Sequence, residues 1–406
     1  MAGGSAYGAG ENMSDSLPVP AADPAPPRFI HRIGVEVRPA AVIDDKGIPK
    51  GGSSVWSPSG SSFSTHLKYS FSLNPNTLAG KVHAGAYQGI GIGWFDFHEK
   101  KVLGNPTAFY LFQGAHIARI SPRLSFDYEW NFGLSAPWKP YDPVNNPSNW
   151  VIGSKVNAYI NASFYLNYAV SRHLELAAGV NVTHFSNGNT KFPNAGLNTA
   201  GAKFGVVYNF NKDGGAFPNT SYDQRIPDFP RHVSYDLVFF GSWRRRGILM
   251  GEETIMLPDS YTVLGFSFAP MYNFGHNFRA GVALDGFYDS SANLIFEDYI
   301  VPLGEYTEGP GFTEPPLSKQ LALGLSGRVE FVMPYFTIGL GVGTNVLHGG
   351  GDMKSVYQIL SLKIEVSRNS FVHVGYSLHN FKEPNFLMLG VGFRFNNKAP
   401  CHYRYR

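Results

Sequence analysis

The sequence predicts an all-β protein, a transmembrane antiparallel β-barrel of about sixteen strands, and three observations support this prediction. Aromatic residues make up 15% of the 406 residues, charged residues only 16%, and 46 residues are glycine. Long segments alternate strictly between apolar and polar side chains. No run of about 18 apolar residues occurs, which argues against membrane helices, whereas a barrel strand needs only about 10 alternating residues.

The segment 155–170 shows the alternation most clearly. Its apolar positions are Val156, Ala158, Ile160, Ala162, Phe164, Leu166, Tyr168 and Val170. Strands of soluble proteins are typically about 5–6 residues long, so this length is typical of a tilted strand with lipid on one side. The alternative, a soluble β-sandwich, also alternates but over shorter stretches and without an aromatic outer face.

Sixteen segments of this kind follow one another along the chain. They lie near 30–43, 61–73, 84–97, 107–120, 123–136, 155–170, 174–186, 198–210, 231–247, 260–273, 277–290, 319–333, 336–347, 355–367, 370–379 and 386–395. Tight turns such as Ser121-Pro122 and Pro334-Tyr335 alternate with long loops such as 137–154. Outer-membrane barrels have short periplasmic turns and long extracellular loops, so the loop 187–197 is expected on the extracellular side.

The two halves of the chain resemble each other. Pro27-Arg28 opens the first and Pro230-Arg231 the second, while Phe210-Asn211 and Phe395-Asn396 close them. We therefore expect a disordered tail at 1–27, an eight-stranded barrel at 28–211, a linker at 212–230 and a second, degenerate eight-strand repeat at 231–398. One sixteen-stranded barrel is the alternative.

Composition also bears on location and partners. The segment 1–27 has no basic start and no apolar core, so this chain shows no signal peptide and we expect its N-terminus to differ from that of the exported precursor. The net charge of +3 is too small to indicate nucleic acid as a partner. Cys401 is the one cysteine, which excludes an internal disulfide and a cysteine-based metal site.

The segment 174–186 contains the main candidate site. Its lipid-facing side carries Val180 and Val182, and His184 and Ser186 continue the same face. Residues two apart on a strand are about 6.6 Å apart, a gap that an imidazole can span to reach a hydroxyl group. Such a pair is the minimum for a base-activated nucleophile. The alternative is that the strand has left the bilayer here and both side chains are solvated.

The segment 183–198 resembles the signature of the outer-membrane lipid A 3-O-deacylases. That family carries His–aromatic–Ser–Asn at the end of its seventh strand and Pro-Asn-x-Gly in the following loop. His184-Phe185-Ser186-Asn187 and Pro193-Asn194-Ala195-Gly196 match both parts, with the family's spacing. The resemblance covers about 30–210, roughly half of the chain.

The resemblance implies a serine esterase that hydrolyses an acyl ester of lipid A in the bacterial outer membrane. Its partners would be lipopolysaccharide and the outer-membrane lipids, and it would need neither a cofactor nor a metal. Ser186 would be the nucleophile and His184 its general base. Asn194 would lie beside the oxyanion, with Asn187 and Gly188 supporting the loop.

The chain departs from this family at Asn198. The family has a glutamate two residues after the motif glycine, where this sequence has asparagine. Asn198 lies on the same face of its strand as Ala200 and Ala202, so its position suits a third catalytic residue. An amide can orient a histidine, but it cannot stabilise an imidazolium by charge.

The second half is expected to have lost this chemistry. When Val372 and Val374 are aligned with the two valines before His184, the positions of the histidine and serine hold Tyr376 and Leu378. We therefore expect a structural or substrate-binding role for the second half.

Two other functions remain open. An outer-membrane phospholipase would use His184 and Ser186 on another lipid, and a non-catalytic barrel would be a porin-like pore or a scaffold. Inward-pointing Glu129, Glu175 and Lys203, with Asp127, are predicted to pair inside a narrow filled barrel, which favours the enzyme over the pore. The arginines at 244–246 are either phosphate ligands or a solvated strand end.

Overall fold

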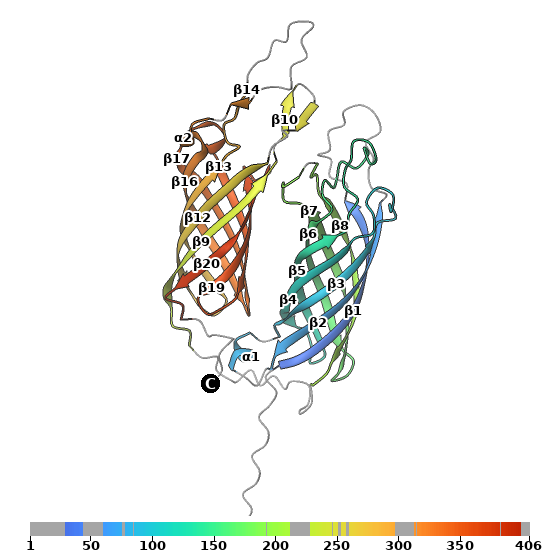
Figure 1. Cartoon of the computed structure of the whole chain (residues 1–406). Coiled ribbons are helices and arrows are strands. Elements are labelled where there is room, and N and C mark those ends of the chain that lie inside the picture. Colours follow the sequence, from blue (N-terminus) through green and yellow to red (C-terminus); the bar gives the residue numbers. More distant parts are fainter. Residues whose placement is uncertain are drawn as a thin grey trace, which may run out of the picture.

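A computed structural model of the chain shows two closed, eight-stranded antiparallel barrels in tandem (Figure 1). It describes residues 29–43, 60–74, 78–83, 85–191, 193–211, 228–245, 247–250, 253–256, 260–296, 312–313, 315–381 and 383–398. The prediction of two tandem barrels is confirmed, and the alternative of one sixteen-stranded barrel is wrong. The predicted tail and nearly all of the predicted linker lie outside the described residues.

The first barrel is built from the strands of the N-terminal half. They are β1 (Phe29–Ile43), β2 (Ser61–Leu73), β3 (Tyr87–Asp96), β4 (Thr107–Arg119), β5 (Leu124–Ala136), β6 (Asn157–Ala169), β7 (Leu174–Ser186) and β8 (Leu197–Asn209). Each strand pairs with the next, and β8 pairs back onto β1 to close the barrel. A short helix, α1 (Leu78–Val82), lies between β2 and β3.

The second barrel repeats this arrangement. Its strands are β9 (His232–Arg244), β12 (Tyr261–Asn273), β13 (Phe278–Asp289), β16 (Leu321–Met333), β17 (Phe336–His348), β18 (Val356–Glu365), β19 (Ser370–His379) and β20 (Glu383–Phe395), and β20 closes onto β9. All sixteen barrel strands begin and end within three residues of the predicted segments.

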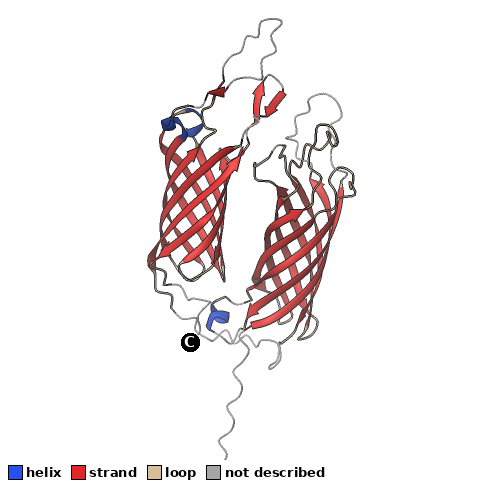
Figure 2. Ribbon diagram, in the orientation of Figure 1, coloured by secondary structure: helices blue, strands red, loops and turns tan. Residues whose placement is uncertain are grey.

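The structure adds small elements that the sequence did not predict. They are the strand pairs β10 (Gly247–Met250) with β11 (Glu253–Met256) and β14 (Ile295–Phe296) with β15 (Phe312–Thr313), the helix α2 (Leu317–Gln320) and the 3-10 turn η1 (Gly351–Met353). All of these lie at the end of the second barrel that carries the long loops, here called the loop end (Figure 2). The opposite end carries the tight turns and is called the turn end.

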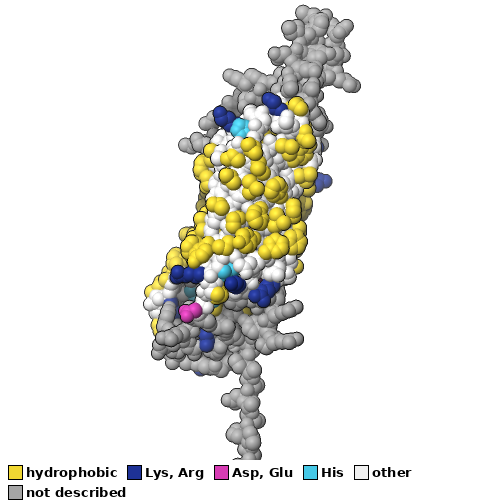
Figure 3. All heavy atoms as spheres, turned by 90° about the vertical axis from the view of Figure 1, so that its left-hand side faces the viewer, with side chains coloured by type: hydrophobic (Ala, Val, Ile, Leu, Met, Phe, Trp, Pro, Cys, Tyr) yellow, Lys and Arg dark blue, Asp and Glu magenta, His cyan; other side chains and the backbone are white. Residues whose placement is uncertain are grey.

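Alternation along each strand separates an apolar outer face from a more polar interior. On β6, Ile160, Phe164 and Leu166 are exposed, whereas Asn161 and Ser163 are buried. Figure 3 shows the result on the second barrel, where a broad apolar band covers the outer face and lysine and arginine side chains gather near its two ends. None of the described helices is long and apolar enough to cross a membrane.

The interior of the first barrel holds a network of paired charges. Lys68 Nζ lies 2.7 Å from Glu36 Oε1 and 2.6 Å from Glu129 Oε1. Lys203 Nζ reaches the same Glu129 oxygen at 3.3 Å, and Arg38 pairs with Glu36 at 2.7 Å. All five side chains are buried. Glu129 and Lys203 therefore pair inside the barrel, as predicted.

The other charges predicted to point inward are paired as well. Asp127 lies 2.7 Å from the ring of His116, and Glu175 lies 2.7 Å from Arg32. An eight-stranded barrel is just wide enough for side chains to fill. These filled positions do not favour the porin-like alternative.

A second network fills the other barrel. Asp236 lies 2.7 Å from Arg279, 2.8 Å from Lys363 and 2.9 Å from Arg394. Lys363 also pairs with Glu330 at 2.6 Å. Both barrels thus fill their interiors with buried ion pairs, which different residues form in each.

The barrels contact each other through the turn between β16 and β17. Phe336 packs edge-on against Trp130 of β5, with ring centroids 5.0 Å apart. The Tyr128 hydroxyl donates to Met333 Sδ at 3.3 Å. The turn end of the second barrel is therefore seated on the outer face of the first.

Glu129→Gln is expected to destabilise the first barrel, because it removes a negative charge from between two buried ammonium groups. Breaking a buried ion pair costs about 3–5 kcal/mol. The measurement is the urea concentration at which the chain unfolds from detergent micelles. Glu99→Gln is the control, since the Glu99 carboxylate has no ion pair among the described residues, and an equal urea midpoint for both variants would contradict the expectation.

Candidate active site

His184 and Ser186 lie on the outer face of β7, at the loop end of the first barrel. The two preceding residues of this face, Val180 and Val182, are 60% and 53% exposed, whereas Phe185 between the candidates is fully buried in the interior. His184 and Ser186 themselves are half-buried. The strand therefore places both polar side chains outside the barrel, at its rim.

Asn198 holds the imidazole of His184. The pairing of β7 with β8 sets the two residues directly opposite each other. His184 Nδ1 lies 2.7 Å from Asn198 Oδ1. Because an amide oxygen only accepts, Nδ1 carries the proton, and Nε2 is left with a free lone pair. This is the tautomer that a general base requires.

Gly196 lies against the Cε1–Nε2 side of the same ring. Its φ is +77°, and a Cβ there would lie 3.0 Å from His184 Cε1 and 3.7 Å from Nε2. Its N–H donates to the carbonyl of Val151 at 3.2 Å, which fixes the loop in place. Both the left-handed backbone and the close approach require glycine here.

The loop after Ser186 is stabilised by its own asparagines. The Asn187 N–H donates to Asn194 Oδ1 at 2.9 Å, and Asn187 Nδ2 donates to the Lys191 carbonyl at 2.7 Å. Gly188 has a φ of +64° and is buried. Within the described residues Asn194 Nδ2 has no hydrogen bond, so its two N–H groups are available to a ligand oxygen.

Hydrogen bonds connect some of the predicted site residues but not all of them. It brings His184 to Asn198 and Asn187 to Asn194. Among the described residues, no hydrogen bond connects Ser186 to His184, although both lie on one face of β7. The serine–histidine pair is therefore adjacent in sequence and face but not hydrogen-bonded.

The second barrel does not repeat the His–x–Ser pair at the matching place. The hydrogen bonds of the Ser171 turn before β7 recur in the Ser367 turn before β19. Counted from these turns, Asn380 stands in the place of His184, whereas the register shift between Ser377 and Leu378 sets His379 opposite Glu383. Neither of these residues is Tyr376, so the predicted match to Tyr376 is wrong. Apolar residues repeat at every second position of a strand, so a shift by an even number leaves the pattern unchanged.

The loop after Ser186 also contacts the second barrel, which the sequence did not predict. Asn189 Nδ2 donates to the Asn385 carbonyl at 3.3 Å, and the Arg245 N–H donates to the Asn189 carbonyl at 3.2 Å. A Cβ on Gly188 would meet the side chain of Leu387 at 2.6 Å. No pattern within one strand could signal a contact between two separate barrels.

Two family models match the chain. Residues 46–207 match the model described as lipid A 3-O-deacylase (PagL), and residues 233–397 match the one described as acyloxyacyl hydrolase, C-terminal domain. The chain thus contains a lipid A 3-O-deacylase domain followed by an acyloxyacyl hydrolase C-terminal domain. Lipid A 3-O-deacylases are ester hydrolases, so the predicted family and enzyme class are confirmed. The first barrel contains the match to the deacylase, and the second barrel the match to the C-terminal domain.

Solved structures also match the chain, at low sequence identity. Neisserial surface protein A is 11% identical with a TM-score of 0.28, and the match covers 45% of this chain and 96% of that one. The toluene transporter TodX of Pseudomonas putida is 9% identical with a TM-score of 0.17, over 91% and 88% of the two chains. No curated protein matches the chain.

Gly196→Ala is expected to lower ester hydrolysis by the deacylase at least tenfold while the barrel still folds. The new methyl group forces the His184 ring to move, and a positive φ costs roughly 1–2 kcal/mol in alanine. The measurement is kcat/KM for lipid A hydrolysis. Gly275→Ala is the matched control, because nothing lies within 4 Å of a Cβ at that position. Unchanged kcat/KM in Gly196→Ala would contradict the role of this glycine.

Proposed function

We propose that the chain is an outer-membrane serine esterase that removes the 3-O acyl chain of lipid A with Ser186 and His184. One observation supports this most: the hydrogen bond from His184 Nδ1 to Asn198 Oδ1 at 2.7 Å, beside a serine on the same outer face. It orients the imidazole and fixes the tautomer whose Nε2 can take a proton. Family membership supplies the substrate class.

The reaction would proceed by acyl transfer to water. His184 Nε2 takes the proton of the Ser186 hydroxyl as Oγ attacks the ester carbonyl, and the alcohol of the sugar leaves with that proton. The Nδ2 group of Asn194 is a donor available to the oxyanion, a type of contact that contributes roughly 10²–10³ in rate. A water molecule, deprotonated by His184, then releases the fatty acid and restores the serine.

The position of the site suits a lipid substrate. The exposed apolar residues below it on β7 and β6, which include Val180, Val182 and Ile160, would lie among the acyl chains of the outer leaflet. The half-buried rim would lie at the level of the headgroups. An acyl chain of lipid A could thus run along the outer face of β7 while its ester lies beside Ser186.

Ser186→Ala is expected to abolish deacylation, because it removes the attacking oxygen. The measurement is mass spectrometry of lipid A after incubation with each protein, in which the parent removes one acyl chain. Ser318→Ala, at an exposed serine of α2, is the control and should behave as the parent. Phospholipid in a parallel sample tests the phospholipase alternative. Lipid A left intact by the parent, or cleaved by Ser186→Ala, would refute the proposal.

In this proposal the side chain of Asn198 determines the size of kcat. An amide orients His184 but does not stabilise the imidazolium, whereas the carboxylate of the family glutamate does both. We expect Asn198→Ala to lower kcat about tenfold and Asn198→Glu to raise it about tenfold, each corresponding to about 1.4 kcal/mol in the barrier. KM should change little in both. A decrease of kcat in Asn198→Glu would contradict this role.

A further inference from the structure

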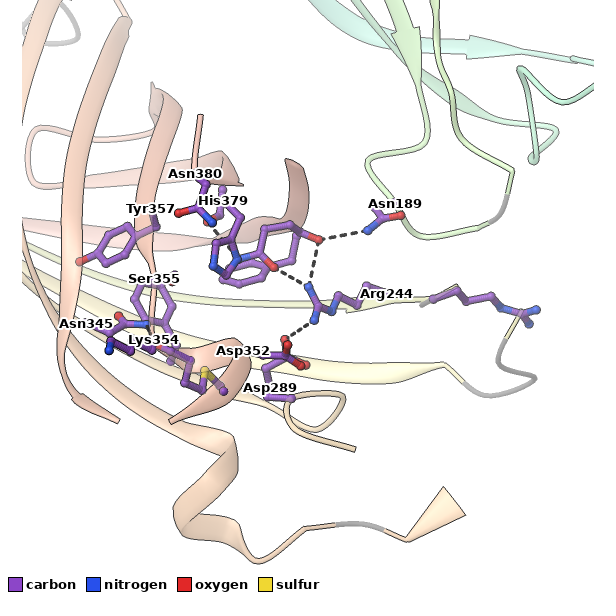
Figure 4. Close-up of a pocket in the computed structure, with 18 residues that line it drawn as sticks. Asn189, Arg244, Asp289, Asn345, Asp352, Lys354, Ser355, Tyr357, His379 and Asn380 are labelled. Carbon is purple, nitrogen blue, oxygen red and sulfur yellow. Dashed lines mark hydrogen bonds and ion pairs between the residues drawn. The ribbon is translucent and has the colours of Figure 1, made fainter. Parts of the chain in front are cut away.

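A pocket of about 440 Å³ lies at the loop end of the second barrel, apart from the proposed catalytic residues (Figure 4). One part of its wall comes from the first barrel, since Asn189 lines it together with residues of β9, β18 and β20. The volume lies in the range of small-molecule sites, about 300–1,000 Å³. The pocket is therefore shared by the two barrels.

The floor of the pocket is aromatic. Phe287 and Phe386 line it, are 6% and 4% exposed, and have ring centroids 5.9 Å apart. Tyr357 lines it as well, and its hydroxyl donates to Asp285 at 2.8 Å, which holds the ring in place. Rigid aromatic faces of this kind suit the apolar face of a sugar ring.

One amide of the wall has an unused acceptor. Asn345 Nδ2 donates to the Met353 carbonyl at 2.8 Å, but Asn345 Oδ1 is buried and has no hydrogen-bond partner in the described part of the chain. A buried acceptor without a partner costs about 1–3 kcal/mol. A hydroxyl or amine of a ligand would satisfy it.

Three cations and two carboxylates line the pocket. Arg244 is fully engaged, since it pairs with Asp289 at 2.8 Å and donates to Ser291 Oγ at 2.9 Å and to the Asn385 side chain. Within the described residues, neither Lys354 nor Arg245 has a side-chain ion pair, and both line the pocket. Free cations beside a polar site suit a phosphate group.

The carboxylates of the pocket do not cancel this charge. Asp289 is occupied by Arg244 and by the Ser291 hydroxyl, which donates to it at 2.6 Å. Asp352 accepts the backbone N–H of Asn293 at 3.1 Å, which leaves its negative charge in place. The lining as a whole, with Arg244, Arg245 and Lys354 against Asp289 and Asp352, therefore carries one net positive charge.

We propose that this pocket binds the phosphorylated sugar headgroup of the acylated substrate. The inference rests on the proposed function, because it assumes that the substrate is a glycolipid cleaved at Ser186. Asn189 is three residues from Ser186, and three residues of extended chain span at most about 11 Å. A disaccharide headgroup held in the pocket thus lies within reach of the serine.

The second barrel then takes part in the reaction. It holds one end of the headgroup, and it holds the loop after Ser186 through Asn189, which Figure 4 shows directed from the first barrel towards the residues around Arg244. Binding of the headgroup and positioning of the nucleophile loop are therefore coupled through the same asparagine.

Binding is measured separately from hydrolysis. The sample is the full chain in detergent micelles, carrying the Ser186→Ala substitution so that no ester is cleaved. Glucosamine 1-phosphate, glucosamine and inorganic phosphate are titrated separately, and binding is followed by saturation-transfer NMR and calorimetry. Glucosamine 1-phosphate should bind at least tenfold more tightly than either part alone. Equal affinity for inorganic phosphate would overturn the sugar component, and no binding of any probe would overturn the proposal.

Lys354→Ala, added to this variant, should weaken glucosamine 1-phosphate binding at least tenfold. Lys319→Ala is the matched control, because Lys319 is an exposed lysine of α2 outside the pocket. Equal effects of both lysines would mean nonspecific attraction and overturn the site. In the active chain, Lys354→Ala should raise KM for lipid A and leave kcat unchanged. If Ser186→Ala still cleaves lipid A, the proposed nucleophile fails while the binding result stands separately.

Discussion

The requirement that every backbone N–H and C=O group find a hydrogen-bond partner governs this structure. Each strand must satisfy its N–H and C=O groups on both edges, so each sheet closes on itself, β8 onto β1 and β20 onto β9. Closure with eight strands leaves an interior that side chains fill, here with buried ion pairs such as Lys68 with Glu129. Since the interior is occupied, the proposed chemistry on a lipid would take place on the outer face and the rim, where His184 and Ser186 lie.

Most of the barrel could be predicted from sequence, because a two-residue period follows directly from one face in lipid and the other inside. The strand 157–169 was predicted within two residues at each end on that ground. The same period explains the failure at β19, since a shift from Asn380 to Tyr376 preserves it. The β10–β11 pair was missed because it lies in a loop with no lipid-facing side to impose alternation.

The candidate site was partly predictable for the same reason. His184 and Asn198 lie at the ends of neighbouring strands on one face, so their contact follows from strand order and register. The pocket was not predictable, because its wall combines the tip of a loop with the mouth of another barrel. Asn189 has a φ of +68°, and it reaches the pocket because the loop turns through left-handed residues. The alternation of apolar and polar residues along a strand gives no information on such a turn.

An even number of strands means that the chain enters and leaves each barrel at the same end, the turn end (Figure 1). A unit of this kind can be copied head to tail and the copy will face the same way, without any change in its loops or turns. If the first unit had seven or nine strands, the chain would leave it at the opposite end, and a copy attached there would stand upside down. An even number of strands thus permits a chain to be lengthened by whole barrels that all face the same way, each of which can carry different loops.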